Sequence, residues 1–93
     1  MNRLVLAASL AERGAVRYTP AGLPALDLML KHESVVSEDG QPRKVSLEMR
    51  AVAIGAITRQ IGAMALGVPG TFSGFLAAGR NGRGQVFHVT ALD

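Results

Sequence analysis

The segment 25–36, ALDLMLKHESVV, places apolar and polar side chains at alternating positions. Its leucines, Leu26, Leu28 and Leu30, fall on one side of an extended chain. The residues on the other side are Asp27, Met29, Lys31 and Glu33. A period of two is typical of a β-strand with one buried face, so this segment predicts a long strand whose leucines face a core.

Four further segments have the composition and period of strands: 2–10, 44–54, 70–78 and 85–92. The middle of segment 2–10 is apolar on both faces, so we expect both faces to be covered. In segment 44–54 the apolar positions change parity near Ala51, which predicts a β-bulge or a strong bend there. The turn between the second and third strands contains Asp39-Gly40, which is a strong hairpin signal.

The segment 55–67 changes to the period of a helix. Its apolar residues Ile57, Ile61, Met64 and Ala65 fall at i, i+4, i+7 and i+8. This is the stripe of one short helix, which Gly67 can end. The order of three strands, one helix and two strands predicts an all-β protein, a five-stranded OB-fold barrel with one short helix between strands 3 and 4. Another small barrel or an α+β sandwich is the alternative.

Length and composition restrict the possible functions. We expect the 93 residues to form a single OB-fold domain, 1–93. Because the chain has no cysteine, disulfides, thiolate metal sites and a cysteine nucleophile are excluded. Two histidines are too few for a histidine-rich metal cluster, and no apolar run approaches the length of a membrane span. The short apolar run after Arg3 has no clear cleavage site, so we expect a cytoplasmic protein, with no cofactor, metal or membrane partner.

Positive charge is concentrated in the second half of the chain. Residues 1–48 contain six basic and six acidic residues, whereas residues 49–92 contain four arginines and no acid. An acid-free basic half favours an anionic partner. Ordinary solvation of surface arginines explains the same pattern, so both interpretations stay open on charge alone.

No arrangement typical of catalysis is present in the sequence. The acidic pair Glu38-Asp39 lies in a polar turn, and His32 and His88 lie on separate predicted strands. The stretch GRNGRG, residues 79–84, connects two strands and lacks the glycine spacing of a dinucleotide-binding loop. We therefore expect a binding protein and not an enzyme.

Basic residues converge on the surface that OB-folds use for oligonucleotides, which is the face of strands two and three with the first-second and fourth-fifth loops. The predicted face and loops contribute Arg17, Tyr18, Lys31, Lys44, Arg50, Arg80 and Arg83. Single-stranded nucleic acid is bound by such a charged groove together with flat groups that stack on bases. Tyr18 is the best stacking candidate because it lies on a loop. We expect the phenylalanines, Phe72, Phe75 and Phe87, to pack in the core.

Three motifs in the chain resemble a known family. NRLVL at 2–6, TPAGLPALDLMLKHES at 19–34 and GFLAAGRNG at 74–82 are similar to primosomal replication protein N, the PriB family. The turn followed by a strand ending in His-x-Ser is shared with bacterial single-stranded DNA-binding proteins. The resemblance implies a homodimeric OB-fold protein that acts in the restart of stalled replication forks. It also implies binding to single-stranded DNA and stimulation of the primosomal helicase PriA, with single-stranded DNA-binding protein and other primosome components as further partners.

The DNA-binding positions of this family correspond to the chain only in part. Basic positions in the first-second and fourth-fifth loops match Arg17, Arg80 and Arg83. An aromatic position in strand three falls on Ser46, and a basic position in strand two falls on Glu33. We therefore expect DNA binding that is weak, dominated by charge and tolerant of sequence.

The first strand also predicts an assembly. Its outer face carries Arg3, Val5 and Ala7, and an apolar strand face needs a cover. We expect a two-fold homodimer that pairs the first strands of two subunits. Two other functions stay open as alternatives: an OB-fold module that binds mainly protein, with incidental DNA contact, and a single-stranded DNA-binding protein without a tail.

Overall fold

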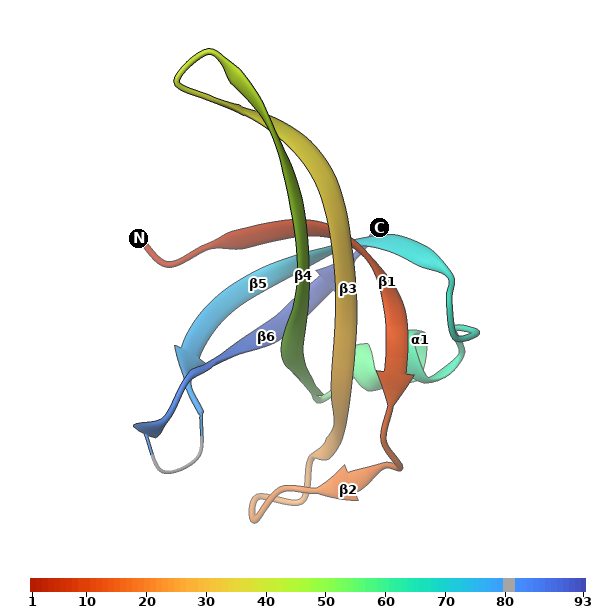
Figure 1. Ribbon diagram of the computed structural model, residues 1–93. Helices are drawn as coiled ribbons and strands as arrows, with labels where there is room; N and C mark the ends of the chain where they lie inside the picture. The colour runs from red at the N-terminus through yellow and green to blue at the C-terminus, as the bar shows by residue number, and fades with distance from the viewer. Residues whose placement is uncertain (80–81) are drawn as a thin grey trace.

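The computed structural model describes residues 1–79 and 82–93, and these residues form a barrel of strands with one short helix (Figure 1). The elements are β1 (Leu4–Arg13), β2 (Arg17–Tyr18), β3 (Pro24–Glu38), β4 (Gln41–Ile54), α1 (Ile57–Gly62), β5 (Pro69–Ala78) and β6 (Gln85–Leu92). The sheet order is β1–β5–β6–β4–β3–β2, and β1 also pairs with β3, so the five long strands close on themselves. This confirms the predicted five-stranded OB-fold barrel, with its helix between the third and fourth long strands.

Apolar side chains from every long strand and from the helix fill the barrel. The largest fully buried ones are Leu10, Leu26, Leu30, Ile61, Phe72 and Phe87. The alternation predicted for β3 is confirmed, because its leucines are buried while Asp27, Lys31 and Glu33 are exposed. Burying a leucine or phenylalanine contributes roughly 1.5–3 kcal/mol, which is more than a surface ion pair gives. The core therefore holds the barrel together.

The strands β3 and β4 form a long hairpin whose tip projects beyond the barrel (Figure 1). Its turn residues Asp39 and Gly40 have φ values of 51° and 74°, as a type I′ turn requires, which confirms the predicted hairpin turn. The pairing runs without a register shift past Ala51, so the bulge predicted there is wrong. The apolar positions change parity for another reason. Val52 points to the outer face but is buried there, only 6% exposed, between its neighbours on β3 and β6.

The helix α1 is shorter than the sequence predicts. It ends at Gly62, and Ala65, expected on its buried stripe, is exposed. The chain leaves the helix early because the following segment pairs with β1: the Gly67 N–H donates to the Leu10 carbonyl (2.8 Å), and the Leu10 N–H donates to the Val68 carbonyl (3.2 Å). Within residues 1–79 and 82–93, no helix is long and apolar enough to cross a membrane.

The strand β1 has two partners in succession. Residues 4–9 pair with β5, and residues 9–13 pair with β3, with a register shift between Leu10 and Glu12. The side chain of Asn2 extends the first pairing, because its Nδ2 donates to the Leu76 carbonyl (2.6 Å) and its Oδ1 accepts from the Leu76 N–H (2.9 Å). A single strand thus joins the two sides of the barrel.

His32 connects β3 to β1 at the point where these strands separate. Its Nδ1 lies against the carbonyl oxygen of Ala7, and its Nε2 lies 2.8 Å from the Ser34 hydroxyl. A carbonyl can only accept, so Nδ1 carries the proton and donates it to Ala7. The His-x-Ser motif therefore has a structural role here.

The strands β5 and β6 approach each other closely at Gly74. The pairing shifts register between Ser73 and Gly74. A Cβ atom at Gly74 would overlap the carbonyl oxygen of His88 and lie 3.2 Å from the ring of Phe87, which is fully buried. Only glycine allows the backbone of β6 to lie at this position, and the burial of Phe87 depends on it.

Replacing Gly74 with alanine should therefore lower the free energy of unfolding by about 1–3 kcal/mol or more, because β6 must move away together with its core side chain. Chemical denaturation measures this change. The control is Gly62→Ala, where the new Cβ meets only Leu26 Cδ1 at 3.8 Å. That variant should be as stable as the parent or up to about 1 kcal/mol more stable. Equal stability of the two variants would contradict the close approach.

Candidate functional site

The outer face of the barrel carries the predicted site residues of β3 and β4. The paired positions on this face are Asp27 with Val52, Met29 with Arg50, Lys31 with Glu48, Glu33 with Ser46, and Val35 with Lys44. The first pair continues onto β6 and β5, because Val52 also pairs with His88, and His88 pairs with Phe75. Four strands therefore contribute to one line of side chains, Asp27, Val52, His88 and Phe75, which we call the four-strand row.

Arg17 reaches this row from β2. Its Nε and one terminal nitrogen donate to the two carboxylate oxygens of Asp27, at 2.9 and 3.0 Å. The hydrogen bonds to Asp27 and its negative charge raise the pKa of Arg17, so the guanidinium stays charged at any physiological pH. A guanidinium has five N–H donors, and the pair with Asp27 uses two of them. Arg17 is therefore held in place while part of its donor capacity is left for a ligand.

A cavity of about 260 Å³ lies over Val52. Its walls include Arg17, Asp27, Arg50 and His88. A second cavity shares the first three of these residues and extends along β3 toward Met29. Arg50 forms no ion pair with any residue that the structure describes. Two arginines predicted from separate parts of the sequence thus line the same hollow.

The rings of Phe75 and His88 stack in parallel beside this cavity. Their centroids are 4.8 Å apart and their planes are inclined by 8°. Phe72 and Phe87 are fully buried, as predicted, but Phe75 is 39% exposed, so its assignment to the core is wrong. Neither Phe75 nor His88 was expected in the site. The signal that could have found His88 is its position between Phe87 and Val89, which face the core and turn it outward.

The two predicted lysines lie apart from the arginines. Lys31 is 3.8 Å from the carboxylate of Glu33 and opposite Glu48 on β4, so acidic side chains surround it. Lys44 is exposed on the projecting part of the hairpin, opposite Val35. The structure therefore places Lys31 in a region of mixed charge and Lys44 toward the hairpin tip, away from Val52.

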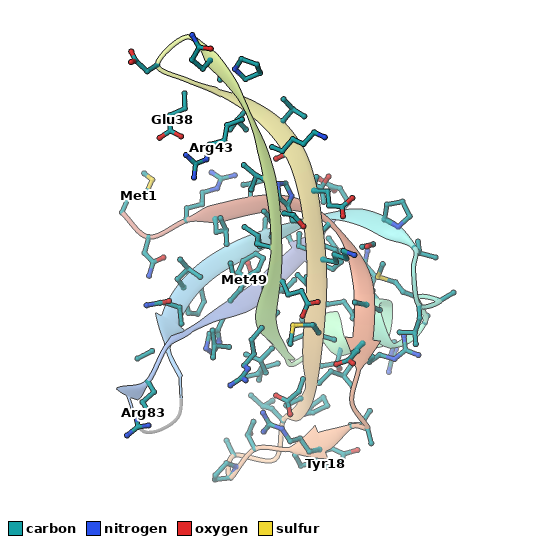
Figure 2. The ribbon with its side chains drawn as sticks, in the orientation of Figure 1. Met1, Tyr18, Glu38, Arg43, Met49 and Arg83 are labelled. Atoms are coloured by element: carbon teal, nitrogen blue, oxygen red, sulfur yellow. The ribbon has the colours of Figure 1, made fainter. Side chains whose placement is uncertain are left out.

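The two predicted loops lie at one end of the barrel. Glu38 and Arg43 pair at 2.9 Å near the tip of the β3–β4 hairpin. Tyr18, on β2, and Arg83, before β6, both lie at the opposite end of the molecule (Figure 2). Tyr18 is 70% exposed and Arg83 is also exposed. Arg80, predicted in the same loop as Arg83, lies outside the described residues. The end that carries Tyr18 and Arg83 is also the end where β2 brings Arg17 to Asp27.

These groups are suited to binding an anion beside flat rings. Arginine forks match phosphate geometry and make strong, charge-assisted hydrogen bonds. Among the described residues, no three His, Cys, Asp or Glu side chains are grouped so that they could hold a metal ion. The arginines of this surface can attract an anion, and its rings can stack on flat groups.

Comparisons with known proteins agree with this geometry. Residues 2–91 match a family model whose description is "Another single-strand binding protein family". The replication restart protein PriB of Bordetella pertussis is 50% identical over 80 residues, which cover 86% of this chain and 75% of that protein. The replication restart protein PriB of Serratia proteamaculans is 32% identical over 99 residues, which cover 99% of this chain and 91% of that protein.

Solved structures show the same relationship. PriB from Ralstonia solanacearum matches with a TM-score of 0.91 at 34% identity, over 100% of this chain and 96% of that one. The single-stranded DNA binding protein from Thermus aquaticus matches with a TM-score of 0.76 at 27% identity, over 100% of this chain and 49% of that one. A close match in both sequence and barrel shape shows that the chain belongs to the PriB group of the single-strand binding protein family.

Proposed function

We propose that this protein binds single-stranded DNA through the arginine-lined end of its outer face, as a non-enzymatic accessory protein of replication restart. The observation that carries the proposal is the joint position of Arg17 and Arg50 around one cavity, beside the stacked rings of His88 and Phe75. Arginines that track a backbone and rings that stack on bases are the two requirements for binding single strands. The names of the relatives, replication restart protein PriB, support the cellular role.

The charges on this surface favour modest affinity. Arg50 is available to phosphate, whereas Arg17 already shares its charge with Asp27. Glu33 and Glu48 lie farther along the same face and repel a phosphate backbone. The bound strand should therefore lie between β2 and the β5–β6 hairpin, and should avoid the middle of the β3–β4 hairpin.

We extend the proposal to the partners of the protein. Membership of the PriB group supports an interaction with the primosomal helicase PriA, whose activity the protein would stimulate in the cytoplasm. Single-stranded DNA-binding protein and other primosome components are the further partners proposed. A test is whether helicase unwinding of a forked DNA rises on addition of this protein, and no rise at saturating concentration would count against the interaction.

The edge of β1 supports a homodimer. Residues 4–8 pair with β5 on one side. On the other side β3 pairs with β1 only from Ser9 onward and His32 bonds to the Ala7 carbonyl, so within the described residues the edge stays open over residues 4–6. Arg3, Val5 and Ala7 are exposed along it. Pairing β1 with its copy across a two-fold axis would cover the edge and the apolar side chains together.

One observation favours the alternative of a protein-binding module. Val35 and Val36, near the tip of the β3–β4 hairpin, are 66% and 45% exposed. If this hairpin is the main functional surface, then replacing both valines with serine should abolish helicase stimulation and leave DNA binding unchanged. If DNA binding is the main function, stimulation should fall when the arginines are removed.

The salt dependence of DNA binding tests the electrostatic proposal. For roughly three to six phosphate contacts, the logarithm of the association constant should fall with the logarithm of salt concentration with a slope of about −2 to −4. In the double variant Arg50→Ala, Arg83→Ala the slope should become shallower by about 1.4, for two contacts at about 0.7 each. Fluorescence anisotropy of a labelled oligonucleotide at several salt concentrations gives both slopes.

Arg43→Ala is the matched control, because it removes an arginine at the opposite end of the hairpin (Figure 2). Arg43 is paired with Glu38, so we expect its loss to leave the slope nearly unchanged. If Arg43→Ala made the slope shallower by as much as the double variant does, the DNA would have to bind elsewhere on the molecule. A flat salt dependence of the parent protein would rule out charge as the main contribution.

The homodimer predicts a specific effect of charge at Val5, which is 52% exposed in the single chain. Val5→Glu would place a carboxylate on the apolar face of each paired β1 strand, so the variant should be monomeric at micromolar concentration while the parent is dimeric. Light scattering measures the mass. Val16→Glu, at an equally exposed valine outside β1, should leave the dimer intact. A monomeric parent protein would overturn the assembly.

A further inference from the structure

We propose that the cavity over Val52 is a nucleobase subsite, in which one base of a bound strand stacks on the ring of His88. The inference rests on the proposed function, since it specifies which part of the DNA enters this site. It concerns the base, whereas the arginine proposal concerns the phosphates, so the two can be tested separately.

The shape of the cavity follows from the four-strand row. Val52 is a short side chain whose cross-strand neighbours are Asp27 on β3 and His88 on β6, and all three line the cavity. Arg50 and Ile54, two residues before and after Val52 on the same face of β4, also line the cavity. Its volume of about 260 Å³ lies just below the range of about 300–1,000 Å³ typical of pockets for drug-sized ligands. The cavity therefore suits one flat ring system.

His88 offers this cavity a prearranged stacking surface. One face of its ring is covered by Phe75, on the β5 side. His88 also lines the cavity, next to its β4 neighbour Val52. Because Phe75 already holds the imidazole in position, stacking a base on this ring from the cavity would cost little side-chain freedom.

The outward-facing residues of β3 and β4 offer a base no other ring to stack on. The described outward residues of β3 and β4, from Asp27 to Val35 and from Lys44 to Val52, include no aromatic ring. Arg17 and Arg50 line the same cavity as His88, so phosphates on either side of a seated base could reach a guanidinium. Stacking on one side and arginines at the rim together select a nucleotide over a free phosphate or an apolar ligand.

The test compares two ligands and two variants. The ligands are a short oligothymidylate and an abasic strand with the same number of phosphates. His88→Ala should weaken binding to oligothymidylate by roughly 5- to 150-fold, the range for one stacked base, with an unchanged salt slope. It should have no effect on the abasic strand. Val52→Met, which fills the cavity and keeps both the rings and the arginines, should show the same selectivity for the base-bearing strand.

Thr90→Ala is the control, because Thr90 is exposed on the same face of β6 beyond the cavity. Thermal denaturation of each variant checks that the barrel stays folded. Equal affinity of His88→Ala, Val52→Met and the parent for oligothymidylate would overturn the subsite. Equal affinity of the parent for both strands would also overturn it, while leaving the proposed DNA binding in place. If the parent binds neither strand, DNA binding and the subsite are both wrong.

Discussion

The barrel depends on the ability of β1 to pair with two strands that lie on different sides of it. The strand bonds to β5 over residues 4–9 and to β3 over residues 9–13, and the register shift after Leu10 lets it turn between them. Leu10 is fully buried at this turn, so closure of the barrel and burial of the core occur together. Without this double pairing, β3 and β5 would each have an open edge, and the buried phenylalanines of β5 and β6 would lose their cover.

Closure of the barrel also creates the candidate site. It brings β2 and the β5–β6 hairpin to the same end, where Arg17 bonds to Asp27 and Arg50 lines the same cavity. The pair formed by Arg17 and Asp27 keeps one charge fixed but partly neutralised, whereas Arg50 is free of ion pairs among the described residues. The site thus combines a positioned arginine with an available one, which suits reversible binding of a long anion better than tight capture of a small one.

The motifs that relate this chain to PriB proteins have mainly structural roles here. Asn2 bonds to the backbone of β5, His32 connects β1 to β3, and Gly74 allows β6 to approach β5. Gly74 also bears on the site, because His88, whose carbonyl it faces, stacks on the neighbouring Phe75. The residues that hold the barrel together therefore also set the position of the stacked rings of Phe75 and His88.

Local periodicity and backbone preference were enough to predict the order of the long strands along the chain, the leucine face of β3, the Asp39-Gly40 turn and the position of the helix. The sequence also predicted Arg17 and Arg50 as binding residues, and the structure places both beside one cavity. Three features could not be read from local patterns: Phe75 leaves the core, α1 ends at Gly62, and Lys31 lies beside two glutamates. Each of these outcomes depends on pairing between distant segments: β5 with β6, residues 67–68 with β1, and β3 with β4. The cavity over Val52 is the clearest case, since its walls come from segments far apart in the chain, which only barrel closure brings together.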